Sequence, residues 1–270
     1  MAFLRHGAYQ QRPNTPSALQ PWALTDAGCA QARTGAHTLK QWALEQGFLL
    51  DPAISCSGAL RAWQTADVLA TTLNQCQAPF HCPDPSQPAV FHPVIEPHLH
   101  ERSVGAAANL TLDEIETALA DDPRYASPPQ DWKSDSHYCL PFEGAESLID
   151  AGARVKTQLE RLCQQSHTRY QPNTASSTAF GPTQNTTTTP VSTLKVVIGH
   201  GASFRHAAYL MGLLPMDQIQ RLSLFHGEPL LFRYQPAISA TAPQITPTWT
   251  QLSGQWKSRT PVHAQGQAPD

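Results

Sequence analysis

The stretch "FLRHGAYQ", Phe3–Gln10, decides the fold, because it joins a short apolar run directly to polar and flexible residues. Ala2–Arg5 has the length and composition of a buried strand, and a polar loop follows it. Arg5, His6 and Gly7 therefore stand where the strand ends, which is where open α/β sheets present their ligand-binding groups. The same layout of strand, polar turn and helix occurs twice more along the chain.

The second unit begins with Ala53–Cys56, which is expected to be a buried strand, and continues into a helix over Leu60–Leu73 that carries Arg61 in its first turn. The third unit is "LKVVIGHGASFRHAAYLMGLL", in which the turn "GHG" places His200 after a strand and before a helix. Strands that alternate with helices in this way indicate an α/β fold with a layered sheet.

Further helices follow from capping residues and helical spacing. The stretch "LTDAGCAQARTGAHTLKQWALEQG" is predicted to be a helix that Thr25 or Asp26 caps and Gly47 closes. A shorter helix, "TLDEIETALA", is expected to begin after Thr111. Many prolines interrupt Gln77–Pro97, and this stretch is expected to be irregular.

The predicted organisation is one domain over residues 1–256. From Gln171 to Thr193 the chain has no charged residue and eight threonines, which favours a flexible loop within that domain. Residues 257–270 are expected to form a disordered tail.

Composition excludes several functional classes. Hydrophobic residues make up 40% of the chain, charged residues 14%, and the formal net charge is −3, so a nucleic-acid-binding surface is not expected. No apolar run reaches the length of a membrane span, and no signal peptide is visible. The cysteines form no C-x-x-C pair, and free thiols in the cytoplasm are the expectation: Cys29, Cys56, Cys76, Cys82, Cys139 and Cys163.

If the three strands are parallel neighbours, two arginines and two histidines meet at one edge of the sheet. Arg5 and Arg61 carry planar guanidinium groups that suit phosphate oxygens. Gly201 allows close backbone approach at the start of a helix, whose N-terminus favours an anion. One histidine, His6 or His200, could then attack phosphorus directly.

Five motifs, in this order, make residues 2–215 resemble the histidine phosphatase superfamily in its phosphoglycerate mutase-like branch: "LRHG", "SCSGALRAWQTA", "LHERSVG", "FEGAES" and "VVIGHGASFRHAAYL". The resemblance implies a three-layer fold with a mixed, mostly parallel central sheet flanked by helices. It implies that His6 is the nucleophile, that Arg5, Arg61 and His200 bind the phosphoryl group, and that neither a metal nor another cofactor is needed.

Phosphoryl transfer to an imidazole needs a carboxylic acid near the leaving oxygen. In "EPHLHERSVG" the family pattern places this proton donor at Glu101. Other branches use an aspartate beside the second histidine, where this chain has a glycine and an alanine. Glu96, Asp26 and Glu146 remain alternatives. The spacing of His98, His100 and Glu101 could instead suggest a metal site. A third ligand to complete such a site is not evident in the sequence.

The chain departs from the family pattern near the substrate pocket. Where the mutase-like branch often has Glu-Ser-x-x-Asn, this chain has Ala8–Arg12, so Arg12 either replaces a phosphate contact or is solvated. Glu146 either lines the pocket or caps its helix. Arg102 follows Glu101 as it does in mutases, and it is a third candidate for the pocket.

The leading hypothesis is a phosphatase that hydrolyses a phosphorylated small molecule, with a phosphoprotein not excluded as substrate. A mutase that returns the phosphoryl group to another hydroxyl is the second hypothesis. A phosphate-binding module without turnover is the third, and it belongs to a different functional class. Fold-level similarity does not separate them.

Overall fold

A computed structural model describes residues 1–79, 90–169, 192–236 and 247–259. Its centre is a six-stranded sheet in the order β4-β3-β6-β1-β8-β9. The first four of these strands are parallel, and β8 and β9 are antiparallel to their neighbours. Their bounds are β1 (Ala2–Arg5), β3 (Ala53–Cys56), β4 (His92–Ile95), β6 (Val196–Gly199), β8 (Pro229–Gln235) and β9 (Thr248–Ser253).

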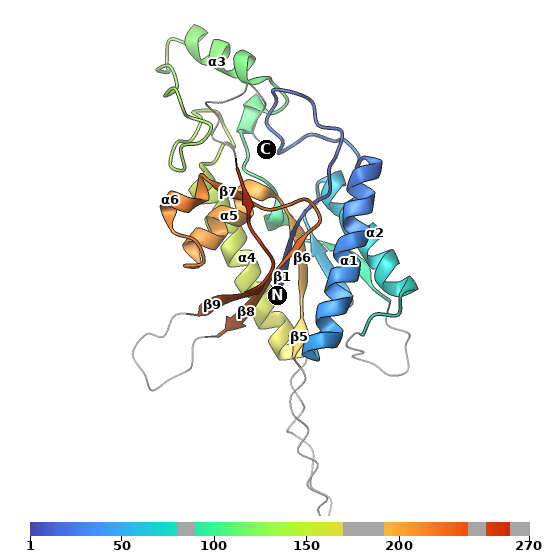
Figure 1. The fold of residues 1–270 in the computed structure, drawn as a ribbon. Coiled ribbons are helices and arrows are strands. Elements are labelled where there is room, and N and C mark those ends of the chain that lie inside the picture. The colour runs from blue at the N-terminus through green and yellow to red at the C-terminus, as the bar shows by residue number, and fades with distance from the viewer. Residues whose placement is uncertain (80–89, 170–191, 237–246, 260–270) are drawn as a thin grey trace, which may run out of the picture.

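Helices cover both faces of this sheet (Figure 1). On one face, α1 (Asp26–Gln46) packs on α2 (Leu60–Gln75), and their apolar residues join Ala2, Leu4 and Ile198 in one core cluster. On the other face, α4 (Leu148–Arg169) packs on α5 (Gly201–Leu210) over Phe3 and Val197. The expected three-layer α/β fold with a mixed, mostly parallel sheet is therefore confirmed.

Helix ends follow the capping residues of the sequence. The Thr25 side chain accepts a hydrogen bond from the Gly28 amide at the start of α1, and Gly47 ends the helix with φ of 68°. Thr111 precedes α3 (Leu112–Asp121) and forms a capping box with Glu114. These three positions stand as the sequence predicts.

Short elements complete the chain. Two two-stranded ribbons form, β2 (Leu49–Leu50) with β5 (Thr193–Leu194) and β7 (Leu222–Ser223) with β10 (Lys257–Ser258). The remaining short elements are η1 (Pro97–Leu99), η2 (Gly105–Ala107) and α6 (Met216–Ile219). Between η2 and α4 lies a cluster of buried apolar side chains around Ile115 and Trp132. Helix α3, which carries part of this cluster, lies beyond the end of the sheet, at the top of Figure 1.

One strand was not predicted. The stretch Gln77–Pro97 was expected to be irregular, yet its residues 92–95 form β4, which pairs in parallel with β3. Proline is tolerated in a sheet only where its missing N–H is not needed, and β4 is an edge strand, so Pro93 can face outward. Residues 80–89 of this stretch lie outside the described part of the chain.

The chain is still paired in a strand at residue 257, where the sequence predicts that a disordered tail begins. Lys257 and Ser258 pair with β7, and the Arg259 amide donates to the carbonyl of Arg221. The ribbon gives these backbone groups partners that the local composition does not reveal. Residues 260–270 and most of the Thr-rich stretch 171–193 lie outside the described residues, and Thr193 at its end belongs to β5.

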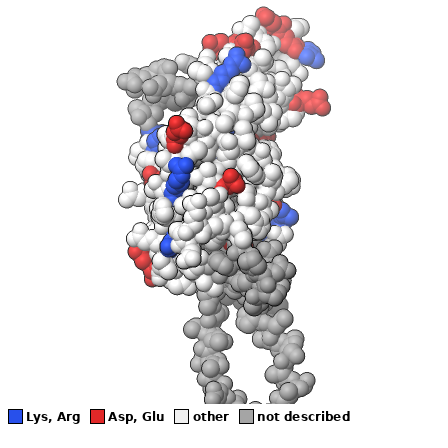
Figure 2. All heavy atoms as spheres, turned by 90° about the vertical axis from the view of Figure 1, so that its right-hand side faces the viewer, with Lys and Arg blue, Asp and Glu red and all other residues white. Residues whose placement is uncertain are grey.

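Charged side chains are sparse on the face drawn in Figure 2, where acidic and basic groups are scattered without a large patch of one sign. Within the four described segments, no helix is long and apolar enough to cross a bilayer.

The loop after β1 lies unusually close to α1. A Cβ built on Gly28 would stand 2.0 Å from the carbonyl oxygen of Ala8, whereas one on Gly58 would meet only Ile95 at 3.5 Å. We expect Gly28→Ala to lower the free energy of unfolding by about 1–3 kcal/mol, the usual cost of overpacking, despite alanine's higher helix propensity. Gly58→Ala is the matched control. Equal denaturation midpoints for the two variants would contradict this close approach.

Candidate active site

Two histidines emerge side by side because β1 and β6 are parallel neighbours in register. Arg5 pairs with Gly199, so His6 and His200 are each the first residue beyond their strand. Their rings are 5.1 Å apart, between centroids, and both are almost fully buried. The expectation that three distant strand ends converge is met by this pair and by Arg61 from the second unit.

Arg61 links the two rings. Its Nε donates to His6 Nε2 at 3.2 Å, and its Nη2 lies 3.3 Å from His200 Nδ1. The guanidinium is fully buried, and it also donates to the carbonyls of Ser17 at 2.7 Å and Gln20 at 3.1 Å. Its position in the first turn of α2 therefore brings a fixed positive charge between the imidazoles.

The partners of each ring determine which nitrogen carries a proton in the neutral imidazole. His6 Nδ1 lies 2.8 Å from the Gly7 carbonyl, which can only accept, so Nδ1 is the donor and Nε2 has the lone pair. His200 Nδ1 faces a guanidinium, which can only donate, so the proton is on Nε2, 2.8 Å from Ser57 Oγ. In this tautomer the lone pair of His6 is on Nε2, the nitrogen that faces Arg61.

Burial holds the pKa of His6 well below its ordinary value, and the charges of His200, Arg61 and Arg5 act in the same direction. The pKa of His200 is also well below its ordinary value, first through burial and then through Arg61 and Arg5. Both imidazoles are consequently neutral at pH 7 in the free protein. A neutral His6 is the form that can act as a nucleophile.

The backbone around the pair is shaped for close approach. A Cβ on Gly201 would lie 3.3 Å from Arg5 Nε, so glycine gives the guanidinium of Arg5 room beside the start of α5. The amide of Gly7 donates to Thr65 Oγ1 at 2.9 Å, and this hydroxyl donates to the Arg61 carbonyl. These bonds fix the loop that carries His6 to the helix that carries Arg61.

Glu101 lies at the N-terminus of α5. Its Oε1 accepts from the amides of Ser203 and Arg102, both at 2.9 Å, and its Oε2 accepts from the amide of Ala202 at 3.1 Å. The side chain is 7% exposed and lines two adjoining pockets, one with His100 and Leu60 and the other with Ser17 and Ala202. Its carboxylate therefore contacts the backbone that closely follows His200, and it also borders open space.

The three alternative carboxylates have other surroundings. Glu96 accepts from Gln158 Nε2 at 2.7 Å and from Arg161 Nη2 at 3.0 Å on the α4 side of the sheet. Asp26 is exposed in the first turn of α1. None of the residues that line the two pockets at Glu101 is Glu96, Asp26 or Glu146.

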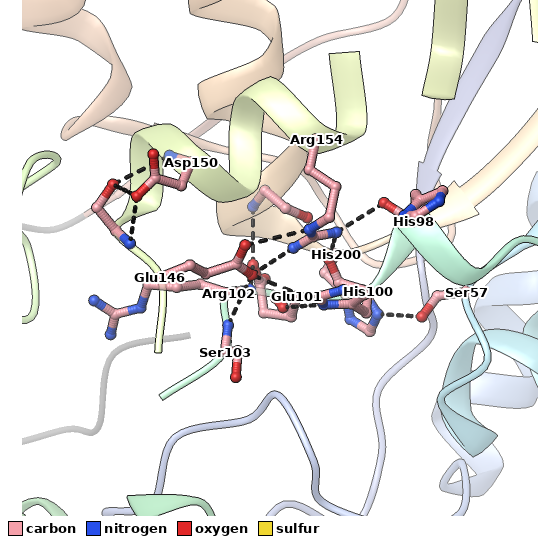
Figure 3. A network of polar contacts seen from close by, with 12 residues as sticks. Ser57, His98, His100, Glu101, Arg102, Ser103, Glu146, Asp150, Arg154 and His200 are labelled. Atoms are coloured by element: carbon pink, nitrogen blue, oxygen red, sulfur yellow. Dashed lines mark hydrogen bonds and ion pairs between the residues drawn. The ribbon is translucent and has the colours of Figure 1, made fainter. Parts of the chain in front are cut away.

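Glu146 and Arg154 hold the segment that carries Glu101 (Figure 3). Arg154 Nη2 is 2.5 Å from Glu146 Oε1, and Arg154 Nη1 donates to the carbonyls of His98 at 2.7 Å and His100 at 3.1 Å. Glu146 also accepts from the amide of Ser103 at 3.0 Å. Its contacts are therefore those of a residue that orients the 98–103 backbone. Glu146 lines neither of the two pockets at Glu101, and at the start of α4 it is the Ser147 hydroxyl that accepts from the Asp150 amide.

Arg12 does not point into the site. Its side chain is exposed and donates to the carbonyl of Asn109 at 2.9 Å, because the loop after β1 turns toward α3. Arg102 does line a pocket, and its guanidinium lies 5.8 Å from the ring centre of Trp132. Of the two arginines proposed for the pocket, the structure brings only Arg102 to it.

The alternative metal site at His98, His100 and Glu101 does not assemble. Within the described segments, no group of three or more His, Cys, Asp or Glu side chains could hold a metal ion. His100 Nδ1 is bonded to the Glu101 carbonyl at 2.9 Å, and the Glu101 carboxylate faces α5.

The family model for the histidine phosphatase superfamily, branch 1, matches residues 1–170. The chain belongs to this superfamily. Solved structures agree in fold: "Mycobacterial hydrolase 1" has 18% identity, a TM-score of 0.57, and coverage of 94% of this chain and 96% of the other. A mycobacterial glucosyl-3-phosphoglycerate phosphatase has 19% identity, a TM-score of 0.55, and coverage of 86% and 88%. No curated protein gives a significant sequence match.

Several residues around the site of this histidine phosphatase family member were not predicted. The ring of His226 is 5.4 Å from that of His6, and its Nδ1 lies 2.7 Å from the His6 carbonyl. Tyr9 lies under the guanidinium of Arg61, with 4.7 Å between ring centre and Cζ. Tyr9 was visible in the opening stretch, but His226 stands outside every motif, and only the pairing of β8 with β1 brings it near.

The buried neutral histidines make stability depend on pH. Below 6.5, the ordinary pKa of histidine, the unfolded chain binds protons that folded His6 and His200 do not, so the free energy of unfolding falls as pH falls. Each histidine contributes a slope approaching about 1.4 kcal/mol per pH unit. We expect His200→Asn to reduce the slope measured by urea denaturation below about pH 6.5, with His37→Asn on α1 as the control. An unchanged slope in His200→Asn would contradict the assignment.

Proposed function

We propose that the protein is a phosphatase that hydrolyses phosphomonoesters of small molecules through a phosphohistidine on His6. The observation that carries the proposal is the lone pair of His6 Nε2, which faces Arg61 Nε at 3.2 Å in a buried, cation-rich site. Family membership supports the proposal, and so does the shared fold with a mycobacterial phosphatase.

In the first step, His6 Nε2 attacks phosphorus and the bond from phosphorus to the leaving oxygen breaks. Arg5 and Arg61 would hold the non-bridging oxygens and stabilise the charge that develops on them. His200 would join them as a donor once the incoming anion favours protonation of its Nδ1. The Gly201 amide, at the start of α5, would add a donor with the partial positive charge of a helix N-terminus, since the next two amides are bonded to Glu101. This assigns phosphate binding to Arg5, Arg61, His200 and Gly201, and nucleophilic catalysis to His6.

Glu101 is the proposed proton donor. Its Oε1 accepts two amide bonds, whereas Oε2 accepts one and keeps a further acceptor position. Oε2 is thus the atom that would carry the proton to the departing alkoxide. The resulting carboxylate would then take a proton from water, whose oxygen attacks phosphorus and breaks the bond to Nε2. Phosphate leaves, and His6 and the acid are regenerated.

The mechanism as proposed needs no divalent metal. A metal in phosphoryl transfer neutralises charge on the transferred group. Here the guanidinium groups of Arg5 and Arg61 lie around the nucleophile and would supply that charge. The positive charge that a metal would bring to the phosphoryl group would therefore come from the chain's own side chains.

Hydrolysis requires water at Glu101, and this distinguishes a phosphatase from a mutase. The pocket lined by His100, Leu60 and Glu101 has a volume of about 690 Å³, which supports access of water to the carboxylate. A mutase would have to exclude this water and return the phosphoryl group to a second hydroxyl. Release of inorganic phosphate in proportion to ester consumed separates the two outcomes.

We expect His6→Ala to abolish turnover of p-nitrophenyl phosphate in a buffer that contains a strong chelator. The wild-type enzyme should form an acid-labile, alkali-stable phosphoenzyme after rapid quenching, and His6→Ala should form none, because the nucleophilic nitrogen is absent. His37→Ala, at an exposed site on α1, is the matched control. A phosphoenzyme in His6→Ala, or wild-type activity that chelator removes and a metal restores, would contradict the mechanism.

Glu101→Gln is expected to act selectively on poor leaving groups. Loss of the general acid should slow hydrolysis of alkyl phosphates by about 10²–10⁴-fold, and aryl phosphates much less, because a nitrophenolate departs with little protonation. Steady-state kcat values for glycerol 3-phosphate and p-nitrophenyl phosphate measure this contrast, with the exposed Glu45→Gln as control. An equal loss on both esters would assign proton transfer to another group.

A further inference from the structure

The larger of the two pockets at Glu101 has mostly apolar walls, and we call it the apolar pocket. Three segments form it: the loop after β1, the start of α2 and the stretch between β4 and η2. Glu101 is the one Asp, Glu, Lys or Arg among the described residues that line it. Its apolar lining residues are Ala18, Leu19, Pro21, Ala59, Leu60 and Pro97.

Large apolar side chains remain exposed around this pocket. Leu19 is 60% exposed and Leu60 is 40% exposed, and both line it. Trp63 is also exposed, less than one helical turn after Leu60 on α2. Ile95 is exposed beside Gly58 of the pocket wall, where a Cβ would stand 3.5 Å from Ile95 Cγ2. Exposed apolar side chains that gather around a concave site mark it as a place for an apolar ligand.

The loop that carries Leu19 is tied down by hydrogen bonds. The side chain of Gln20 accepts from the Arg12 amide at 2.8 Å and donates to the Thr15 carbonyl at 3.0 Å. The Gln20 carbonyl accepts in turn from Arg61 Nη1 at 3.1 Å. The exposure of Leu19 is therefore built into the loop, and a wall with a fixed position loses little conformational entropy when a ligand packs against it.

The apolar pocket adjoins the reaction centre. Arg61, which bonds to both histidines, follows Leu60 directly in the chain and holds the opposite loop through the Ser17 and Gln20 carbonyls. Glu101 is part of the pocket wall, and its Oε2 is the atom proposed to protonate the leaving oxygen. The part of a substrate attached to that oxygen therefore has a direct path into the apolar pocket.

Volume decides between the two pockets that Glu101 borders. The apolar pocket has about 690 Å³, which is within the range of about 300–1,000 Å³ typical of small-molecule sites. The other pocket has only about 70 Å³, which is too little for most alcohols. The leaving group is consequently expected in the apolar pocket.

We propose that the apolar pocket binds the leaving alcohol of the substrate and that this alcohol is itself apolar, an aromatic or aliphatic group without a second charge. The proposal rests on the proposed function, since the phosphoryl group to be cleaved occupies the site at His6. It narrows the substrate class to phosphomonoesters of apolar alcohols, with Leu19 and Leu60 as specificity-determining residues. Once the alcohol departs, water enters by the same pocket and hydrolyses the phosphohistidine.

The test uses ethyl, butyl and hexyl phosphate, whose leaving oxygens have nearly the same basicity and whose charge is the same. Calorimetric titration of His6→Ala, in which turnover is prevented, gives the Kd of each ester. Each methylene that the pocket removes from water should strengthen binding by about two- to fourfold. Hexyl phosphate should therefore bind at least about ten-fold more tightly than ethyl phosphate.

Two variants in the His6→Ala background replace apolar wall with polar side chains, Leu60→Gln and Leu19→Gln. Both should lower the gain in affinity per methylene. This gain is the readout because a variant that merely disturbs the phosphoryl site weakens all three esters alike. Leu19→Gln leaves α2 unchanged, so it separates loss of the apolar wall from a displacement of Arg61.

Leu44→Gln is the matched control, since Leu44 is 62% exposed on α1 and lines neither pocket at Glu101. It should keep the gain per methylene. Equal Kd values for ethyl and hexyl phosphate, or a gain that both wall variants leave unchanged, would overturn the proposal. Equal Kd values together with a dimer that Leu19→Gln dissociates in sedimentation would assign the exposed side chains to a second copy of the chain instead.

Turnover by the wild-type protein separates this failure from failure of the proposed function. Phosphate release from all three esters with equal kcat/KM would contradict the apolar pocket while the phosphatase stands. Tighter binding of the longer esters to His6→Ala, with no phosphate released by the wild-type protein, would contradict the phosphatase while the apolar pocket stands.

Discussion

The parallel pairing of β1 with β6 is the constraint on which the site depends. With Arg5 opposite Gly199, the residues that follow the two strands are a pair of histidines whose ring centres are 5.1 Å apart. A shift of one residue would send one of the two side chains to the opposite face of the sheet. The apolar residues Phe3 and Leu4, fully buried on opposite faces, make such a shift costly.

Charge in the site is arranged around one buried guanidinium. Arg61 is held by two backbone carbonyls and bonds to nitrogens of both histidines, so its position does not depend on a carboxylate partner. The charge therefore remains available to an incoming anion, and both imidazoles stay neutral beside it. Glu101 is kept apart by its bonds to α5, which leaves it near the leaving group and outside the phosphoryl site as proposed.

Sequence patterns predicted the parts of the fold that local residues determine. Strand ends at Arg5 and Gly199, and caps at Thr25 and Thr111, follow from apolar runs and capping side chains, and they are confirmed. The patterns did not reveal contacts between distant segments. The ion pair of Glu146 with Arg154 and the approach of His226 to His6 arise only from packing. The exposed position of Arg12 has the same origin.

The edge strand β4 has a consequence for association between molecules. Alternate residues of a strand direct their N–H groups to opposite sides, and the amides of His92 and Glu96 point toward β3. Pro93 stands at an outward position and has no N–H, which leaves Ile95 as the outward donor within β4. A strand from another molecule would find too few donors there to extend the sheet. The proline that prevented prediction of this strand thus protects the edge against fibrous aggregation.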